Sequence, residues 1–347
     1  MSGILLTKYT MTSLQSINKQ YNYCLDFIKG IACIFVVFMH CEFPGTTGVV
    51  IQAFSRYCVP FFFMVSGFYY CSNKTFDVKE RKEKAKHIGI ITAWATLFYI
   101  VFGLVWGILL HDFLWSFTAK DIIAFLFCNQ MFFIVSQMWF LYALLYVYVA
   151  LIFIDPEWLR KHCFVIAIVC LLLYICLAQG LHLAKIYVPN YVYKNWLIEG
   201  FGFFALGFSL RLFGEKISVS NTLLLCIIAI TTLLSILERY LLGRDFGVNI
   251  CSIPQATALM LYAINNPFKH EGVIQRLGRD CSMMVYILHS AIWHSMDGIY
   301  DVAGFTDNMP AQYLKPIFVV VLSILGAMIF NYLVASDRKK RFAVKII

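Results

Sequence analysis

Charged residues are scarce in this chain. They make up 14% of its 347 residues, whereas an ordinary soluble domain has about 25%. Hydrophobic residues reach 61%, against about 45–50% in such a domain. Because so little polar surface cannot cover so large an apolar fraction in water, a soluble fold is excluded. No stretch rich in Pro, Gly and Ser separates the apolar runs, which indicates one membrane domain.

Motifs for nucleotide hydrolysis, metal binding and secretion are also missing. The sequence has no Walker or GxGxxG pattern. Its 12 cysteines are scattered, mostly inside apolar runs, so we predict neither a disulfide framework nor a metal site. The first polar stretch, residues 1–23, lacks the apolar core and small-residue cleavage site of a signal peptide, so the first span is expected to stay as an anchor.

Long apolar runs recur along the chain. A membrane helix needs about 20 mostly apolar residues, so the runs predict an all-α, polytopic integral membrane protein with about ten spans. The predicted spans are 24–41, 52–71, 88–110, 136–154, 163–183, 195–213, 219–240, 249–266, 279–300 and 312–334. Residues 121–135 are apolar but short and interrupted by Asn129 and Gln130, so we expect an interfacial or re-entrant segment.

The basic residues predict the orientation of these spans. The net charge is +9, but membrane proteins gather Lys and Arg on the cytoplasmic side, so we expect a lipid bilayer and no nucleic acid as partner. Most of the 28 Lys and Arg fall on one side if both termini are cytoplasmic. We therefore predict a cytoplasmic segment 1–23, a membrane domain 24–334 and a basic cytoplasmic tail 335–347.

Two ionisable residues lie in the first predicted span. Lys29 and His40 are separated by three helical turns plus about 20°, so both lie on one helix face, roughly 16 Å apart along the axis. Ionisable groups within a span usually face the bundle interior and mark substrate or proton paths. The alternative is that Lys29 reaches lipid phosphate and His40 rests at the interface.

His40 suits a general base. Its unperturbed pKa of about 6.5 lets an imidazole take and return a proton near neutrality. Glu42 is positioned to orient this ring only if the chain bends after the helix, which Pro44 and Gly45 would allow.

The second predicted span combines a cation, a proline and small residues. Arg56 needs a partner or an aqueous cavity, since Arg keeps its charge regardless of burial. Pro60 is expected to break or kink the helix. Ser66 and Gly67 offer a surface where a thin ligand chain or, alternatively, another helix comes close.

The loop 73–87 is the densest basic patch of the sequence. Phosphates of a cytosolic donor would bind there, with Lys82 and Lys86 as candidates; attraction to anionic lipid is the alternative. Further polar or amphipathic groups occur at membrane depth in later spans, where Trp139 and Tyr286 also fit aromatic belts or packing. These groups are Trp139, Asn195, Glu199, Tyr286 and His289.

Together these segments resemble the acyltransferase family 3 of membrane-bound O-acyltransferases. The first span has the family's Arg or Lys, ten intervening residues and a His, and the second span has its FFxxSGF-like signature. Three later segments are also similar: WFL-ALL at 139–145, G-FF-LG at 202–207 and LG-x3-S-x3-Y-x2-H at 277–289. The family usually has Arg where this chain has Lys29, and Lys cannot bind a carboxylate or phosphate in bidentate fashion.

The resemblance implies an O-acyltransferase of the bacterial inner membrane. It implies that an acyl group, acetyl from acetyl-CoA in our prediction, passes to a hydroxyl of a surface polysaccharide or lipid-linked sugar. The predicted catalytic residues are His40, Lys29 and Arg56. The predicted donor-binding residues are Lys29, Ser66, Gly67, Lys82 and Lys86. The predicted acceptor-binding residues are Glu42, Trp139, Glu199, Tyr286 and His289.

Two other classes of function are compatible with a polytopic chain. A transporter or flippase for a glycan or small anion would distribute charged residues along a pore, and here they concentrate on the first two spans. The absence of matching Gly/Pro-broken helices in two halves also argues against an inverted-repeat transporter. A membrane sensor or scaffold would tolerate alanine at Lys29 and His40.

Overall fold

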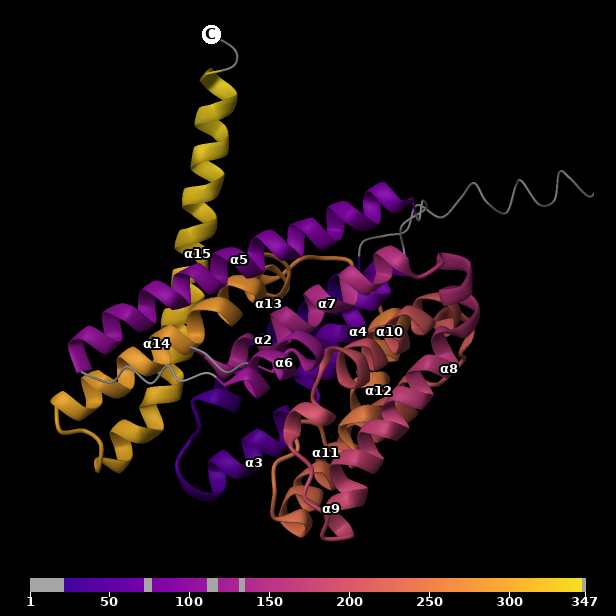
Figure 1. Ribbon diagram of the computed structural model, residues 1–347, viewed down its shortest axis with the longest axis horizontal. Coiled ribbons are helices and arrows are strands. Elements are labelled where there is room, and N and C mark those ends of the chain that lie inside the picture. Colours follow the sequence, from indigo (N-terminus) through magenta and orange to yellow (C-terminus); the bar gives the residue numbers. More distant parts are fainter. Residues whose placement is uncertain (1–21, 72–76, 111–117, 131–134, 345–347) are drawn as a thin grey trace, which may run out of the picture.

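The computed structural model describes residues 22–71, 77–110, 118–130 and 135–344, and within these ranges the chain forms helices and no strand. The first seven helices are α2 (Tyr23–His40), α3 (Gly45–Ser55), α4 (Cys58–Cys71), α5 (Val78–Leu110), α6 (Ala119–Cys128), α7 (Trp139–Phe153) and α8 (Pro156–Ile175). The others are α9 (Leu181–Leu183), α10 (Phe201–Phe213), α11 (Asn221–Leu242), α12 (Ser252–Asn265), α13 (Val273–Arg276), α14 (Ser282–Val302) and α15 (Met309–Val344). Figure 1 shows them packed as a bundle, from which the C-terminal half of α15 projects.

Eight helical segments of the described chain are long and apolar enough to cross a membrane. The remaining two predicted spans correspond to α12 and α14. The α12 helix has only 14 residues, fewer than the roughly 20 that a full crossing needs. The α14 helix has 21 residues but carries His289, His294, Asp297 and Asp301 among them. The multi-pass membrane architecture is therefore confirmed, and eight of the ten predicted spans meet this criterion of length and composition in the described chain.

The segment predicted to be interfacial or re-entrant forms the short helix α6. With ten residues it is about 15 Å long, half the thickness of a hydrocarbon core. Asn129 ends this helix in the left-handed conformation, with φ 47°. Its side chain donates to the backbone oxygen of Trp139 and accepts from the backbone nitrogen of Trp196. Asn129 thus ties this segment to the start of α7. Residues 131–134 lie outside the described ranges.

The second predicted span is divided into α3 and α4. The helix breaks at Arg56 and Tyr57, within the four residues that precede Pro60. Proline has no N–H for the hydrogen bond to the carbonyl four residues earlier, which here is that of Arg56, and its ring clashes with that carbonyl. The predicted break at Pro60 is therefore confirmed, and it leaves Arg56 at the junction between two helices.

Two pairs of helices are joined through glycine. On α4 and α10, a Cβ at Gly67 would lie 1.9 Å from the Phe204 oxygen, and one at Gly207 would lie 1.9 Å from the Met64 oxygen. On α2, a π-helical turn η6 (Leu277–Cys281) packs so closely that a Cβ at Gly278 would lie 2.0 Å from the Asp26 oxygen. Since only glycine allows such backbone contact, these positions fix α10 against α4 and the start of α14 against α2.

Candidate active site

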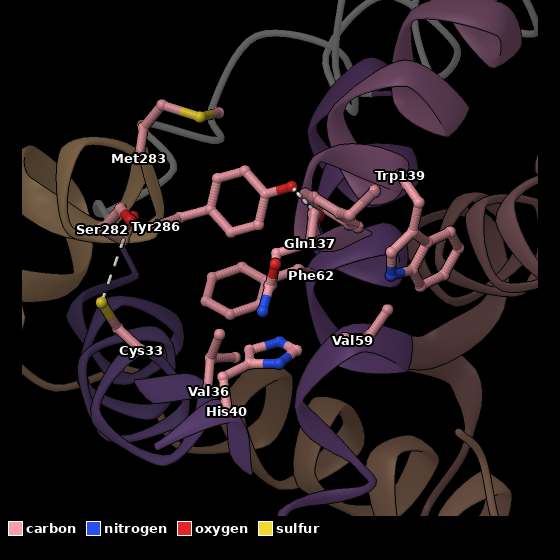
Figure 2. Close-up of a pocket in the computed structure, with 11 residues that line it drawn as sticks. Cys33, Val36, His40, Val59, Phe62, Gln137, Trp139, Ser282, Met283 and Tyr286 are labelled. Atoms are coloured by element: carbon pink, nitrogen blue, oxygen red, sulfur yellow. Dashed lines mark hydrogen bonds between the residues drawn. The ribbon is translucent and has the colours of Figure 1, made fainter. Parts of the chain in front are cut away.

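The face of α2 that carries Lys29 and His40 borders a cavity. Cys33, Val36 and His40 line it, and Lys29 lies one turn before Cys33 on the same helix face. The cavity has a volume of about 60 Å³. His40 is half-buried and directs its imidazole into this space (Figure 2). The shared face expected from helix geometry therefore forms one wall of this cavity.

Residues from α4, α7, α14 and the 3₁₀ turn η1 (Ser136–Met138) complete the cavity. The further lining residues are Val59, Phe62, Gln137, Trp139, Phe140, Ser282, Met283 and Tyr286. Two predicted site residues, Trp139 and Tyr286, thus meet His40 here. Gln137 and Ser282 were missed as candidates. Their signal was the presence of polar side chains within segments of membrane depth that also carry Trp139 and Tyr286.

A second helix face lies opposite that of α2. Ser282 and Tyr286 line the cavity, and His289 lies on the same face of α14. The imidazole centroids of His40 and His289 are 5.4 Å apart. Since Gly278 touches α2 near Asp26 and His289 touches it near His40, the two helices run in parallel with facing stripes of residues.

His289 is fully buried, with 0% of its surface exposed. Its Nδ1 lies 2.7 Å from the backbone oxygen of Tyr286 and 3.2 Å from that of Val285. Carbonyl oxygens only accept, so Nδ1 carries the proton and Nε2 keeps a lone pair. His289 is not among the residues that line the cavity, and its ring packs beside that of His40.

Gln137 presents an amide group to the cavity. Tyr286 donates its hydroxyl to the Gln137 backbone oxygen at 2.5 Å, which holds α14 against the start of α7. The Gln137 side-chain oxygen accepts from Ser136 at 3.4 Å, and no described residue accepts from its amide nitrogen. In Figure 2 this carboxamide points toward the His40 imidazole. A hydrogen-bond donor aimed into a cavity is suited to stabilise an oxyanion.

Glu42 does not orient His40. The chain does bend after α2, and Gly45 begins α3 with φ +63°. However, the Glu42 carboxylate is exposed and accepts from the Gln52 amide at 2.6 Å. The bend therefore turns Glu42 toward α3 and away from the imidazole, so the predicted pairing is wrong.

Arg56 has a carboxylate partner. Its guanidinium, with 7% of the side chain exposed, pairs with Asp245 from the loop between α11 and α12. Its Nη2 makes this pair, and its Nη1 lies 3.1 Å from the Met39 sulfur. Arg56 does not line the cavity, and its contacts with Asp245 and Met39 join this loop to α2.

We expect Asp245→Ala to lower the free energy of unfolding by about 2 kcal/mol. Removing one partner leaves the Arg56 charge buried without compensation, which costs about 3–5 kcal/mol in a fully buried pair, and here the Asp245 side chain is 34% exposed. Thermal unfolding of the detergent-purified protein measures this loss. The exposed Asp307→Ala serves as the control, and equal melting temperatures of both variants would contradict the pairing.

A charged cluster lies beside the Trp139 ring. Lys194 places its ammonium 4.7 Å from the centroid of that ring. Burial lowers the pKa of Lys194. The negative charges of Glu199 and Asp245 oppose this shift, and the positive charge of Arg56 reinforces it. Glu199 lies in the π-helical turn η4 (Trp196–Gly200), with 1% exposure and an oxygen that no described residue contacts by a hydrogen bond. Glu199 thus belongs to this cluster and does not line the cavity.

Lys29 forms an ion pair at the other end of α2. Its ammonium lies 3.4 Å from Asp26 Oδ1, and the Asp26 side chain is only 1% exposed. Asp26 was missed by the sequence interpretation, although a carboxylate three residues before a lysine in an apolar run was its signal. The pair holds Lys29 on the helix surface in line with the cavity.

A second, open cleft of about 550 Å³ lies where α4 ends and α5 begins. Its lining residues are Tyr69, Tyr70, Glu83, Lys84, His87, Ile88 and Tyr148. Lys84 lies 4.6 Å from the Tyr70 ring centroid. The predicted residues Lys82 and Lys86 are exposed and do not line it. Lys84 and His87 do line the cleft. Because α5 begins at Val78, these two residues are helical, and the helix periodicity places them on the side that faces α4.

Arg81, Gly67 and Ser66 make contacts within and between helices. Arg81 is buried and donates to the backbone oxygens of Leu151 and Ile154, at 3.0 and 2.7 Å, where α7 ends. The surface at Gly67 is occupied by α10. Helix packing, which was the alternative to a ligand chain at this surface, therefore accounts for Gly67. Ser66 donates to the Phe62 oxygen at 2.9 Å within its own helix.

Comparisons with known proteins identify one family. The family described as "Acyltransferase domain" has a model that matches residues 22–336, nearly the whole chain. No curated protein and no solved structure matches the chain. Among the described residues, no group of three or more His, Cys, Asp or Glu side chains is arranged to hold a metal ion.

Proposed function

The chain belongs to acyltransferase family 3, and from that premise we propose that it transfers a short acyl group, acetyl from acetyl-CoA, to a hydroxyl of a lipid-linked or surface glycan. One observation carries this proposal. The cavity at His40 and the aromatic cleft at Lys84 lie along the same faces of two helices.

The shared faces follow from residue spacing. On α4, the residues at intervals of three and four are Val59, Phe62, Ser66 and Tyr69, of which the first two line the cavity and the last lines the cleft. On α7, Phe140 lines the cavity and Tyr148 lines the cleft, two turns later on the same face. The two spaces are therefore about 10–15 Å apart along α4.

This geometry suits a donor with a phosphorylated head and a long, thin arm. Lys84 offers a cationic group and His87 a hydrogen-bonding group to phosphates, beside the Glu83 carboxylate, and the tyrosines offer surface to a base. An arm that follows α4 past Ser66 would bring a thioester to His40. Coenzyme A has this chemistry, and we propose that Lys29 and the cleft form the donor side.

The chemistry in the cavity needs a base and an oxyanion donor. His40 takes the proton from the acceptor hydroxyl, whose oxygen attacks the thioester carbonyl. The Gln137 amide donates to the oxyanion that forms, a role for which Arg56 is unsuited because Asp245 neutralises it. The carbon–sulfur bond then breaks, the new ester remains on the acceptor, and His40 returns its proton to the thiolate.

The acceptor would enter from the side of Trp139 and Lys194. A flat indole is suited to contact with a sugar ring, and the nearby ammonium is suited to hydrogen bonds with sugar hydroxyls. We place this side outside the cell and the Lys84 cleft in the cytoplasm, with the protein in the bacterial inner membrane. This orientation follows the positive-inside rule applied to the sequence.

Incubation of the purified, membrane-reconstituted protein with isotopically labelled acetyl-CoA and a lipid-linked glycan tests the proposal. We expect label to appear on the glycan as an alkali-labile ester and free CoA to appear in equal amount. A transporter or flippase would leave no acylated product, so label recovered only as intact acetyl-CoA would overturn the proposal.

The donor cleft makes a separate prediction. We expect Lys84→Gln to raise KM for acetyl-CoA about tenfold, since loss of one charge-assisted phosphate contact costs roughly 1.4 kcal/mol. Lys82→Gln, on the same helix but exposed, is the matched control and should leave KM unchanged. Initial rates across acetyl-CoA concentrations measure both. Equal KM values would place the phosphates elsewhere.

A further inference from the structure

The ring of His40 has no carboxylate to orient it. Glu42, the residue expected in that role, is bonded to Gln52, and no Asp or Glu is among the described residues that line the cavity. In a Ser-His-Asp triad the carboxylate fixes which nitrogen of the histidine carries the proton, and it stabilises the imidazolium that forms. The ring that packs beside His40 is instead the imidazole of His289.

We infer that His289 is the positioning residue of His40, and that its Nε2 accepts a hydrogen bond from the His40 ring N–H that faces away from the substrate. The inference rests on the proposed acyl transfer and deepens it, because it gives the general base a partner. The sequence predicted that His289 binds the acceptor. Here it acts through His40 and touches no substrate.

The hydrogen bonds of His289 define its free acceptor atom. Its Nδ1 lies 2.7 Å from the Tyr286 oxygen and 3.2 Å from the Val285 oxygen. Carbonyl oxygens only accept, so the proton is on Nδ1 and the lone pair is on Nε2. Within the described chain, the hydrogen-bond partner of Nε2 is the Ser290 hydroxyl, at a long 3.5 Å. A side chain with 0% exposure therefore keeps a lone pair that is nearly unused.

The two imidazoles are close enough for this bond. Their centroids are 5.4 Å apart and their planes differ by 31°. A ring nitrogen lies roughly 1 Å from its centroid, so two nitrogens that face one another across this separation come to about 3 Å. The torsion about the His40 Cβ–Cγ bond has a broad energy minimum, so a small rotation of this half-buried ring aligns them. Catalytic hydrogen bonds often tighten in this way when substrate binds.

A neutral imidazole suits this position better than a carboxylate. An ionised carboxylate with 0% exposure would need a cation beside it, since an uncompensated buried charge is strongly destabilising. The nearest cation along α2, Lys29, is already paired with Asp26. His289 supplies a lone pair without a buried charge, and positive charge appears only on His40, which borders the cavity, when it takes a proton.

The proton balance of the reaction is unchanged. His40 takes the hydroxyl proton of the acceptor on the nitrogen that faces the cavity, while its other N–H donates to His289. No proton passes to His289, and the proton on His40 goes to the CoA thiolate when the carbon–sulfur bond breaks. The bond to His289 is strongest while His40 is charged, so it stabilises the transition state more than the ground state.

An apolar and a polar replacement of His289 test the inference in the full chain reconstituted in membranes. His289→Leu removes the acceptor atom, so we expect the single-turnover rate of acetyl transfer to fall about ten- to a hundredfold, the range of a hydrogen bond to a charged group. The acetyl-CoA concentration that gives half the maximal rate should not change. His289→Gln returns an acceptor oxygen to this place and should recover the rate to within about threefold of the wild-type value.

His294→Leu is the matched control, since His294 lies on the same helix, is half-buried and does not line the cavity. It should keep the wild-type rate. Melting temperatures show that the variants are folded, and His289→Met, with a more adaptable apolar side chain, replaces His289→Leu if the latter does not fold.

A wild-type rate in the apolar variant would overturn the inference and leave the acyltransferase function intact. Equal losses in the apolar variant and His289→Gln, at the wild-type melting temperature, would overturn it as well, because the acceptor atom would then make no difference. Absence of transfer by the wild-type protein would instead overturn the proposed function.

Discussion

Replacing His40 by alanine is expected to lower acyl transfer by about a thousandfold or more. General-base catalysis contributes about 10²–10⁴-fold to such reactions, and His40 is the imidazole that opens into the cavity. The Gln137 amide and the donor cleft remain in this variant, so binding of acyl-CoA should persist while kcat falls. Transfer of labelled acetyl to a lipid-linked glycan in membranes measures the loss.

Two comparisons make this result specific. His162→Ala changes a histidine on α8 that does not line the cavity, and it should keep the wild-type rate. The melting temperature of His40→Ala should match that of the wild-type protein to within a few degrees, since a half-buried side chain that borders a cavity contributes little packing. Transfer at the wild-type rate by His40→Ala would remove this residue from the mechanism, and would favour the sensor or scaffold class.

The largest expected loss of stability follows from Gly67→Ala. A Cβ at this position would lie 1.9 Å from the Phe204 oxygen, which belongs to backbone and cannot rotate away. The helices α4 and α10 would have to separate along their whole contact, so we expect the free energy of unfolding to fall by about 3 kcal/mol or more. Thermal unfolding in detergent, followed by circular dichroism, measures the change.

Gly89→Ala provides the matched comparison. This glycine lies within α5, and an added Cβ would meet only the Leu145 side chain at 3.7 Å, an ordinary contact. Its replacement should leave stability unchanged or raise it by about 0.5–1 kcal/mol, since alanine favours a helix over glycine. If Gly67→Ala melts at the same temperature as Gly89→Ala, the backbone contact between α4 and α10 is not as close as described.

The sequence predicted features that depend on local geometry. The shared face of Lys29 and His40 follows from helical periodicity alone, and Cys33 and Val36 between them do line the cavity. The break before Pro60 follows from the chemistry of one residue. The membrane class follows from composition, and the family from motifs whose order along the chain matches.

Features that depend on tertiary contacts could not be predicted from the sequence. Asp245 lies 189 residues after Arg56, and no local pattern joins them. Lys84 lines the cleft and Lys82 and Lys86 do not, because α5 begins at Val78 and so includes all three lysines. Residues 73–87 were predicted to be a loop, and a loop does not tell which way a side chain faces. The shortness of α12 likewise reflects how the neighbouring loop folds, which an apolar run does not encode.

The backbone contact of Gly278 with Asp26 has a mechanical consequence. It holds the first turn of the α14 segment against α2, and that turn is the π-helical η6, a geometry that is frequent at functional sites. Beyond this contact, α14 faces the hollow next to His40. We expect α14 to swing about this pivot when an acyl group enters or leaves. Backbone amide hydrogen exchange should then be slow at 277–281 and faster at 282–290. In that case the rate of this movement of α14, more than the rate of ester formation, would limit turnover.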